Sequence, residues 1–140
     1  MKRFLIAIIA ATFASHAATE DDQVAARAEA LDLAGAWSND GFKLRDGFWA
    51  GIAAPAAPKV VQVNLFAGNH YWFSVAAHAR AKGVAIAVFD ESGKPVAVEP
   101  FAEGLRAAAR FSPRVSGPYF IRVTTKEGPP SAFCLVYSYK

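Results

Sequence analysis

The chain has 140 residues, enough for one domain and too few for two domains of ordinary size. Hydrophobic residues make up 54% and charged residues 19%, which excludes a disordered, acidic or collagen-like chain. The single cysteine excludes a disulfide within the chain and any cysteine-based zinc or iron–sulfur site. Since three histidines leave little room for a histidine-based metal centre, we expect no metal and no cofactor.

The first 17 residues have the pattern of a secretory signal peptide. Lys2 and Arg3 form a basic start, residues 4–14 are almost wholly apolar, and Ser15 and Ala17 place small residues before a cleavage point. The apolar stretch is too short to span a bilayer as a helix. The alternatives are a membrane-anchored N-terminus and a buried first helix. We predict export to the periplasm or the extracellular space, with no transmembrane segment in the mature chain.

Removal of the signal peptide would change the net charge of the chain. The full sequence has fifteen Lys and Arg against twelve Asp and Glu, and loss of Lys2 and Arg3 leaves thirteen against twelve, a net charge of +1. The remaining basic residues are scattered and form no cluster that could follow a phosphate backbone. We therefore do not expect nucleic acid as a partner.

An N-terminal arm, residues 18–58, starts the mature chain and ends in an Ala-Pro-rich stretch. A helix is predicted at its start, since Thr19 and Asp22 have capping-box spacing and Gly35 suits a helix end. The apolar face expected for this helix has four members: Val24, Ala28, Leu31 and Ala34.

The second half of the arm is rich in aromatic residues. It contains Trp37, Phe42, Phe48 and Trp49, and residues 42–49 alternate briefly, which indicates a short strand or hairpin. Four large aromatic side chains are too many for an exposed tail. We therefore expect most of them to hold the arm against the rest of the protein.

The body of the chain, residues 59–140, has the alternation of apolar and polar residues that is typical of β-strands. The expected strands include residues 61–65, 71–75, 84–88, 106–111, 119–123 and 133–139, with a further strand led by residues 95–98. Short turns separate these segments, which favours antiparallel pairing because parallel strands need long crossovers. The sequence therefore predicts a mainly β, antiparallel β-sandwich of about seven to eight strands with a short N-terminal helix.

Three short motifs follow one another in this body. They are Val-x-Val-x-Leu-x-Ala-Gly-Asn-x-Tyr-x-Phe-Ser-Val from Val61, Val-x-Ile-x-Val-x-Asp-x-x-Gly from Val84, and Phe-x-Pro-x-x-Ser-Gly-x-Tyr-x-Ile-x-Val from Phe111. Residues 61–137 thereby resemble the bacterial pre-peptidase C-terminal (PPC) domain. The resemblance implies a jelly-roll-like sandwich with a non-catalytic role in secretion, stability or substrate attachment, and some members of the family bind collagen, polysaccharide or calcium.

The chain departs from this family in two respects. It carries no enzyme domain on which an accessory role could act within the same chain. It also has the basic stretch Arg80-Ala81-Lys82-Gly83 where many members carry closely spaced aspartates before the middle strand. We therefore do not expect the family's calcium site.

No catalytic site is predicted. The mature chain has two imidazoles, His70 and His78, and they lack the further ligands that a zinc site needs. A catalytic triad of Ser116, His70 and Asp90 would require the fold to bring these three residues together. The adjacent Asp90 and Glu91 can serve as calcium ligands, but we favour Asp90 as the cap of its own turn. Cys134 is expected to face outward beneath the arm as an unreactive small hydrophobe, the alternatives being a free thiol and an intermolecular bridge.

Four residues are candidates for ligand binding because they share the outward positions of their strands: Trp72, Phe120, Arg110 and Arg122. Exposed aromatic rings can stack on sugars or receive a peptide, and the arginines can line the same surface. The alternative, which the aromatic arm favours, is that the arm covers the rings.

These features together predict an exported, non-catalytic binding or accessory module for a protein or polysaccharide partner, rather than an enzyme. One alternative is a structural subunit of an envelope assembly that docks through an open sheet edge. The other is a small hydrolase that uses His70 or His78.

Overall fold

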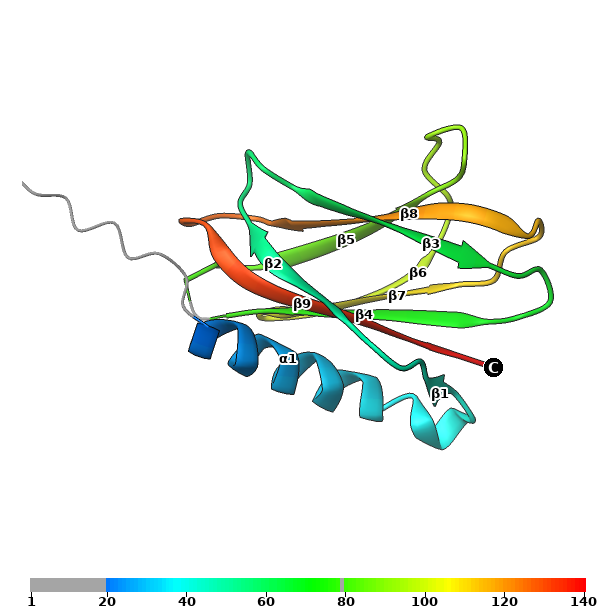
Figure 1. The fold of residues 1–140 in the computed structure, drawn as a ribbon, viewed down its shortest axis with the longest axis horizontal. Coiled ribbons are helices and arrows are strands. Elements are labelled where there is room, and N and C mark those ends of the chain that lie inside the picture. Colours follow the sequence, from blue (N-terminus) through cyan, green and yellow to red (C-terminus); the bar gives the residue numbers. More distant parts are fainter. Residues whose placement is uncertain (1–19, 79) are drawn as a thin grey trace, which may run out of the picture.

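The computed structural model describes residues 20–78 and 80–140, which form one long helix packed against a two-sheet β-sandwich (Figure 1). The helix α1 spans Glu20–Gly35, and a short 3-10 turn follows at Ser38–Asp40. The strands are β1 (Lys43–Leu44), β2 (Trp49–Ala53), β3 (Lys59–Leu65), β4 (Tyr71–Ala77), β5 (Val84–Phe89), β6 (Glu99–Glu103), β7 (Arg106–Phe111), β8 (Gly117–Thr125) and β9 (Ser131–Tyr139).

The strands divide into a larger and a smaller sheet, and every strand pair is antiparallel. The larger sheet has the order β1-β9-β4-β7-β6, and β2 also pairs with β9; the smaller sheet has the order β3-β8-β5. The predicted mainly β sandwich with an N-terminal helix is therefore confirmed. The strand number exceeds the expected seven to eight, because the arm contributes both β1 and β2.

The main core fills the space between the two sheets. Its largest fully buried side chains come from both sheets, with Phe73 and Leu135 from the larger sheet and Leu65 and Ile121 from the smaller one. These residues occupy alternate positions of their strands, so one face of each sheet meets the other sheet. The expected alternation is thereby confirmed for the inner face.

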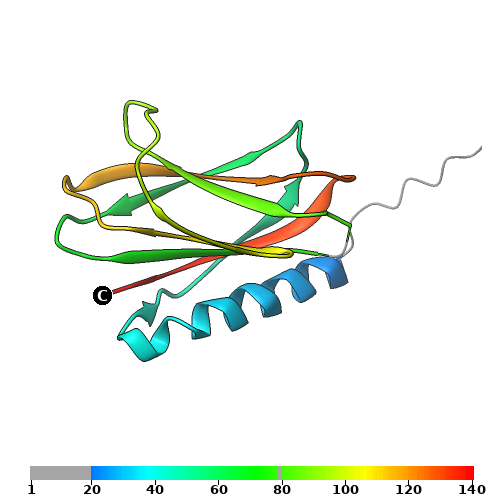
Figure 2. The same cartoon turned by 180° about the vertical axis from the view of Figure 1, so that it is seen from behind.

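The helix α1 covers the outer face of the larger sheet, as seen from both sides in Figures 1 and 2. Ala26, Ala30 and Ala34 lie one helical turn apart and pack against Cys134 and other small side chains of β4 and β9. Small side chains on both partners let the helix lie close to the sheet. As a result the protein has three layers, and β4 is buried along its whole length.

The expected apolar face of this helix is wrong in part. Val24 and Leu31 are 62% and 36% exposed, while the buried face consists of Ala26, Ala30, Leu33 and Ala34. Val24 and Leu31 point to solvent because the alanine face of the helix lies close to the sheet, and Leu33 is buried in a separate cluster with Phe42, Trp72 and Ala108. Thr19, the expected start of the capping box, lies outside the described residues.

Aromatic contacts hold the arm in place, as predicted. The Trp37 ring stacks on Trp72 with ring centroids 3.9 Å apart and planes 5° apart, and its indole Nε1 donates a hydrogen bond to Ser74 Oγ at 3.0 Å. Trp49 stacks on Tyr137 with centroids 5.8 Å apart. The pairing of β2 with β9 also makes residues 49–53 part of the sandwich.

The predicted signal peptide, residues 1–17, lies outside the described residues. Within the part of the chain that the structure describes, no helix is long and apolar enough to cross a membrane.

Candidate functional site

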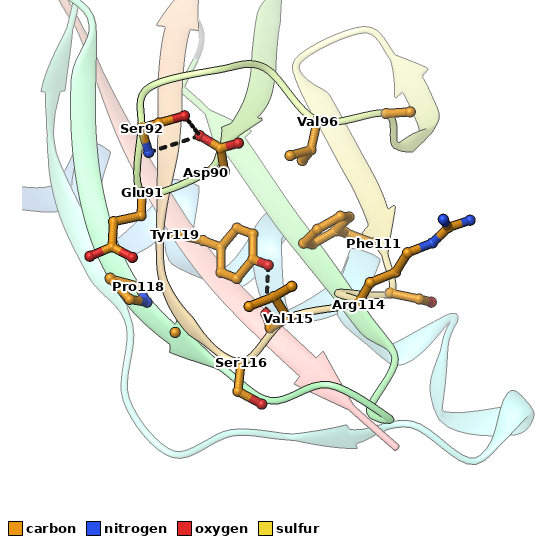
Figure 3. Close-up of a pocket in the computed structure, with 13 residues that line it drawn as sticks. Asp90, Glu91, Ser92, Val96, Phe111, Arg114, Val115, Ser116, Pro118 and Tyr119 are labelled. Carbon is orange, nitrogen blue, oxygen red and sulfur yellow. Dashed lines mark hydrogen bonds between the residues drawn. The ribbon is translucent and has the colours of Figure 1, made fainter.

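A cleft of about 730 Å³ opens at one end of the sandwich, between the β5–β6 loop and the β7–β8 loop (Figure 3). The β5–β6 loop comprises residues 90–98 and the β7–β8 loop comprises residues 112–116. Side chains of Phe111 and Tyr119, at the adjoining ends of β7 and β8, form its floor. A pocket of this size with apolar walls and a few polar groups is typical of a binding site.

The β5–β6 loop is fixed by the side chain of Asp90. Its Oδ1 accepts hydrogen bonds from the Ser92 backbone at 2.9 Å, the Ser92 hydroxyl at 2.7 Å and the Lys94 backbone at 3.0 Å. The hydrogen bond from the Ser92 hydroxyl, with that from the Lys94 backbone, lowers the pKa of Asp90. Asp90 therefore caps its own turn, as we favoured over calcium ligation.

The β7–β8 loop is fixed at three points along its length. Tyr119 donates its hydroxyl hydrogen to the Val115 carbonyl at 2.6 Å, and the backbone amide of Ala67 donates to Ser116 Oγ at 2.8 Å. A third hydrogen bond joins His70 Nδ1 and Ser112 Oγ at 2.6 Å. Hydrogen bonds within the protein thus fix both walls of the cleft, and fixed walls lower the ordering cost of binding.

The chemistry of the cleft differs between its floor and its two sides. The Phe111 and Tyr119 rings meet at 62° with centroids 5.2 Å apart, and the exposed side chain of Val115 extends the apolar surface. Figure 3 shows Glu91 and Arg114 on opposite sides of this aromatic pair. The cleft can therefore receive an apolar group while offering an anion on one side and a cation on the other.

The four predicted ligand-binding residues do not form one surface, because they lie on the outer faces of different sheets. Trp72 and Arg110 are cross-strand partners on the larger sheet, and both contact aromatic residues of the arm. Trp72 is only 6% exposed because Trp37 covers its ring, and Arg110 lies over Phe42 at 5.6 Å. At Trp72 the structure therefore has the covered arrangement that the aromatic arm favoured, and not an exposed platform.

Phe120 and Arg122 lie on the outer face of the smaller sheet, which no described element covers in the way that α1 covers the larger sheet. Phe120 pairs across the strands with Phe89 and Gln62, and Arg122 lies over the Phe89 ring at 4.9 Å. Both rings are half-buried by their neighbours. We refer to the outer surface formed by Phe89, Phe120, Arg122 and Gln62 as the open face.

The residues considered for catalysis have separate partners. His70 contacts Ser112, Asp90 is held within its turn, and Ser116 accepts from Ala67, so within the described residues no hydrogen bond joins the three. His78 Nε2 lies 3.3 Å from Asp22 Oδ1 at the start of α1. Among the residues that the structure describes, no three His, Cys, Asp or Glu side chains gather as metal ligands do.

Cys134 lies beneath α1, as expected, and is fully buried. Burial raises the pKa of its thiol to about 11. The thiolate is the reactive form, so this environment makes Cys134 inert in the folded protein.

Sequence reasoning missed the cleft although it recognised both segments that form it. Residues 90–93 and 116–118 were identifiable as turns, and Tyr119 was identifiable as inward-facing. What places the turns together is the pairing of β5 with β8 and the packing of the two sheets. The motif from Phe111 to Val123 was the one available signal, since it spans Phe111, Arg114, Val115 and Tyr119.

The sequence matches no protein-family model and no curated protein. The resemblance to the PPC domain therefore stays a prediction.

Proposed function

We propose that the protein is an exported, non-catalytic binding module that holds a protein or polysaccharide partner in the cleft between the β5–β6 and β7–β8 loops. The observation that carries the proposal is a cleft of about 730 Å³ whose aromatic floor lies between two loops fixed by hydrogen bonds. Binding residues are often carried by loops on a rigid scaffold, and the sandwich supplies such a scaffold. The signal-peptide pattern of residues 1–17 supports export.

The test compares two valine-to-glutamate variants that differ in their position relative to the cleft. Val115 is 69% exposed at the cleft, and Val24 is 62% exposed on the outer side of α1. Both substitutions add the same charge at an exposed site, so both variants should fold. Envelope extracts and a glycan array are passed over the wild-type protein and each variant.

We expect the partner to bind wild type and Val24→Glu equally, and to be lost or weakened at least tenfold by Val115→Glu. Equal binding by all three proteins would place the interaction elsewhere on the molecule. Turnover of a substrate that survives His70→Ala and His78→Ala would contradict the non-catalytic assignment, and turnover that these changes abolish would favour the hydrolase alternative.

A specific observation favours the open face as a second surface, for a polysaccharide. Phe89 and Phe120 are adjacent rings on a sheet face, and Arg122 and Gln62 offer hydrogen-bond donors beside them. Aromatic rings beside planar polar groups suit the apolar and hydroxylated sides of a sugar. Phe120→Ala should then weaken glycan binding while Val115→Glu leaves it unchanged, and the reverse result would exclude this surface.

The assembly alternative has its support in the edge strand β3. Lys59–Leu65 pairs with β8 on one side, and seven residues is long for an edge strand without a partner on the other side within the described chain. The edge strand β6 of the larger sheet carries Pro100 between Glu99 and Phe101, which discourages pairing there. A Gln62→Pro variant should abolish assembly if β3 pairs with another subunit, and size-exclusion chromatography of envelope complexes measures this.

A further inference from the structure

The two charges that flank the cleft have no partner within the described part of the chain. Neither the Glu91 carboxylate nor the Arg114 guanidinium makes a side-chain hydrogen bond or ion pair there. The neighbouring Asp90 differs, because its Oδ1 is engaged by its own turn and Lys94 acts on it electrostatically. Glu91 is thus the carboxylate on this side that is left for a ligand, and Arg114 is the matching cation across the aromatic floor.

The floor of the cleft between these two charges suits an apolar side chain of a ligand better than a sugar ring. Stacking on a sugar needs an exposed ring face, but Tyr119 is only 7% exposed and its hydroxyl already donates to Val115. What reaches the cleft instead is the partly exposed Phe111 with the side chains of Val96 and Val115 (Figure 3). Aliphatic and aromatic side chains of a partner would bury against such a surface without leaving hydroxyl groups unpaired.

From this charge pattern we infer that the cleft takes a short segment of a protein partner, in which one apolar side chain lies between a basic and an acidic residue. The basic residue faces Glu91, and the acidic residue faces Arg114, whose planar guanidinium can bind a carboxylate through two hydrogen bonds. The inference rests on the proposed binding function of the cleft and specifies its partner. Opposite charges at the two sides also fix the direction in which the segment lies.

The experiment uses a panel of labelled peptides, acetylated and amidated so that their termini carry no charge. Each contains Leu or Phe between Lys and Asp, with the two charged residues in either order and zero, one or two Gly between successive residues, and fluorescence anisotropy measures binding to the purified protein. Control peptides replace both charged residues by Gln or the apolar residue by Ser. We expect the best member to bind at least tenfold more tightly than either control peptide.

A charge reversal in the protein makes the test specific. Arg114→Glu should weaken binding of the best Lys/Asp peptide at least tenfold and should favour the corresponding peptide with Lys at both ends. The matched control is Lys43→Glu, which makes the same two-unit charge change on the exposed strand β1 outside the cleft lining, and it should leave both affinities unchanged.

The inference is overturned if no peptide of the panel binds above its controls, or if wild type and Arg114→Glu show the same preference among the peptides. If a glycan nevertheless binds wild type and is lost in Val115→Glu, the cleft is a binding site for a different ligand class, and the proposed function stands without the inference. If the peptides bind but Val115→Glu does not affect them, the proposed function of the cleft fails as well.

Discussion

Replacing Trp37 by alanine tests whether the arm is a structural layer of the protein. The Trp37 ring stacks on Trp72, meets Phe101 edge-on with centroids 5.9 Å apart, and donates a hydrogen bond to Ser74. Alanine removes all three contacts and opens the outer face of β4 to water. We therefore expect a large loss in the free energy of unfolding.

The magnitude follows from the area and contacts that are lost. An aromatic side chain buries about 150–250 Å², and since Trp37 is half-buried the lower value applies, giving about 4 kcal/mol at about 25 cal/mol per Å². The stacked pair adds about 1 kcal/mol, and alanine retains part of the burial. The loss should therefore be about 3 to 5 kcal/mol, as is usual for a large aromatic residue replaced by alanine.

Two further variants separate the contributions. Trp37→Phe keeps an aromatic ring but leaves the fully buried Ser74 hydroxyl without its donor, so we expect a loss of about 1 to 2 kcal/mol. Phe48→Ala removes an arm aromatic that is 44% exposed, and its loss should stay below about 1 kcal/mol.

Urea unfolding followed by circular dichroism measures these differences. With a slope near 1.5 kcal/mol per M, a loss of about 3 kcal/mol lowers the midpoint by about 2 M. If Trp37→Ala unfolds within about 0.5 kcal/mol of wild type, the arm is not a stabilising layer and the reasoning about the covered face fails. If Phe48→Ala costs as much as Trp37→Ala, the effect does not come from the stacked pair.

Three other predictions concern single residues. Cys134, with a thiol pKa raised to about 11 by burial, should react with a thiol reagent at pH 8 only as fast as the native structure opens, and dilute urea should accelerate the reaction. Asp90→Asn should destabilise the protein at pH 7, and the difference from wild type should shrink as the pH falls into the acid range. The hydrogen bond from the Ser92 hydroxyl lowers the pKa of Asp90 in the folded protein. The stability that the Asp90 carboxylate contributes is therefore complete above about pH 4, the unfolded-state pKa, and is lost as the pH falls through the folded-state pKa. Urea midpoints of wild type and variant that differ by the same amount at every pH would contradict this. Gly128→Ala places a Cβ 2.6 Å from the Arg80 carbonyl oxygen, at a residue whose φ is +102°. The melting temperature should therefore fall by several degrees, corresponding to a loss of about 2 kcal/mol in the free energy of unfolding. An unchanged melting temperature would contradict the close contact.

The strands and their inner faces could be predicted because alternation reflects burial on one side. In β8, Tyr119, Ile121 and Val123 are buried, as their positions predicted, and the residues between them are more exposed. This pattern depends only on neighbours in the same strand, so it is visible in one sequence. The same reasoning indicated one short strand or hairpin at residues 42–49 but could not separate β1 from β2, whose identity as strands depends on their pairing with β9.

The face that α1 buries could not be predicted from hydropathy. Val24 and Leu31 are more apolar than alanine, yet Ala26 and Ala30 form the contact with the sheet. The deciding factor is the shape of the surface that the helix meets, where Cys134 is one of several small side chains. That surface is assembled from strands distant in the sequence, so a helical periodicity alone does not contain it.

Trp72 and Phe120 show why the candidate site was also beyond the sequence. Both have the outward position of their strand, and alternation treats them alike. They differ because β4 belongs to the sheet that the arm covers and β8 to the sheet that it leaves open. Strand alternation assigns a residue to a face, whereas the order of the strands decides whether that face is covered.

The same argument explains why we propose binding at the end and the open side of the sandwich. The arm uses its aromatic residues to close the outer face of the larger sheet, so the rings there contribute to stability. Phe111 lies instead at the end of β7, where the loop that follows it turns away and leaves a cleft against Tyr119. Phe111 remains partly exposed between Glu91 and Arg114 whereas Tyr119 is buried in the core, so Phe111 is the ring of this pair that we propose a ligand to contact.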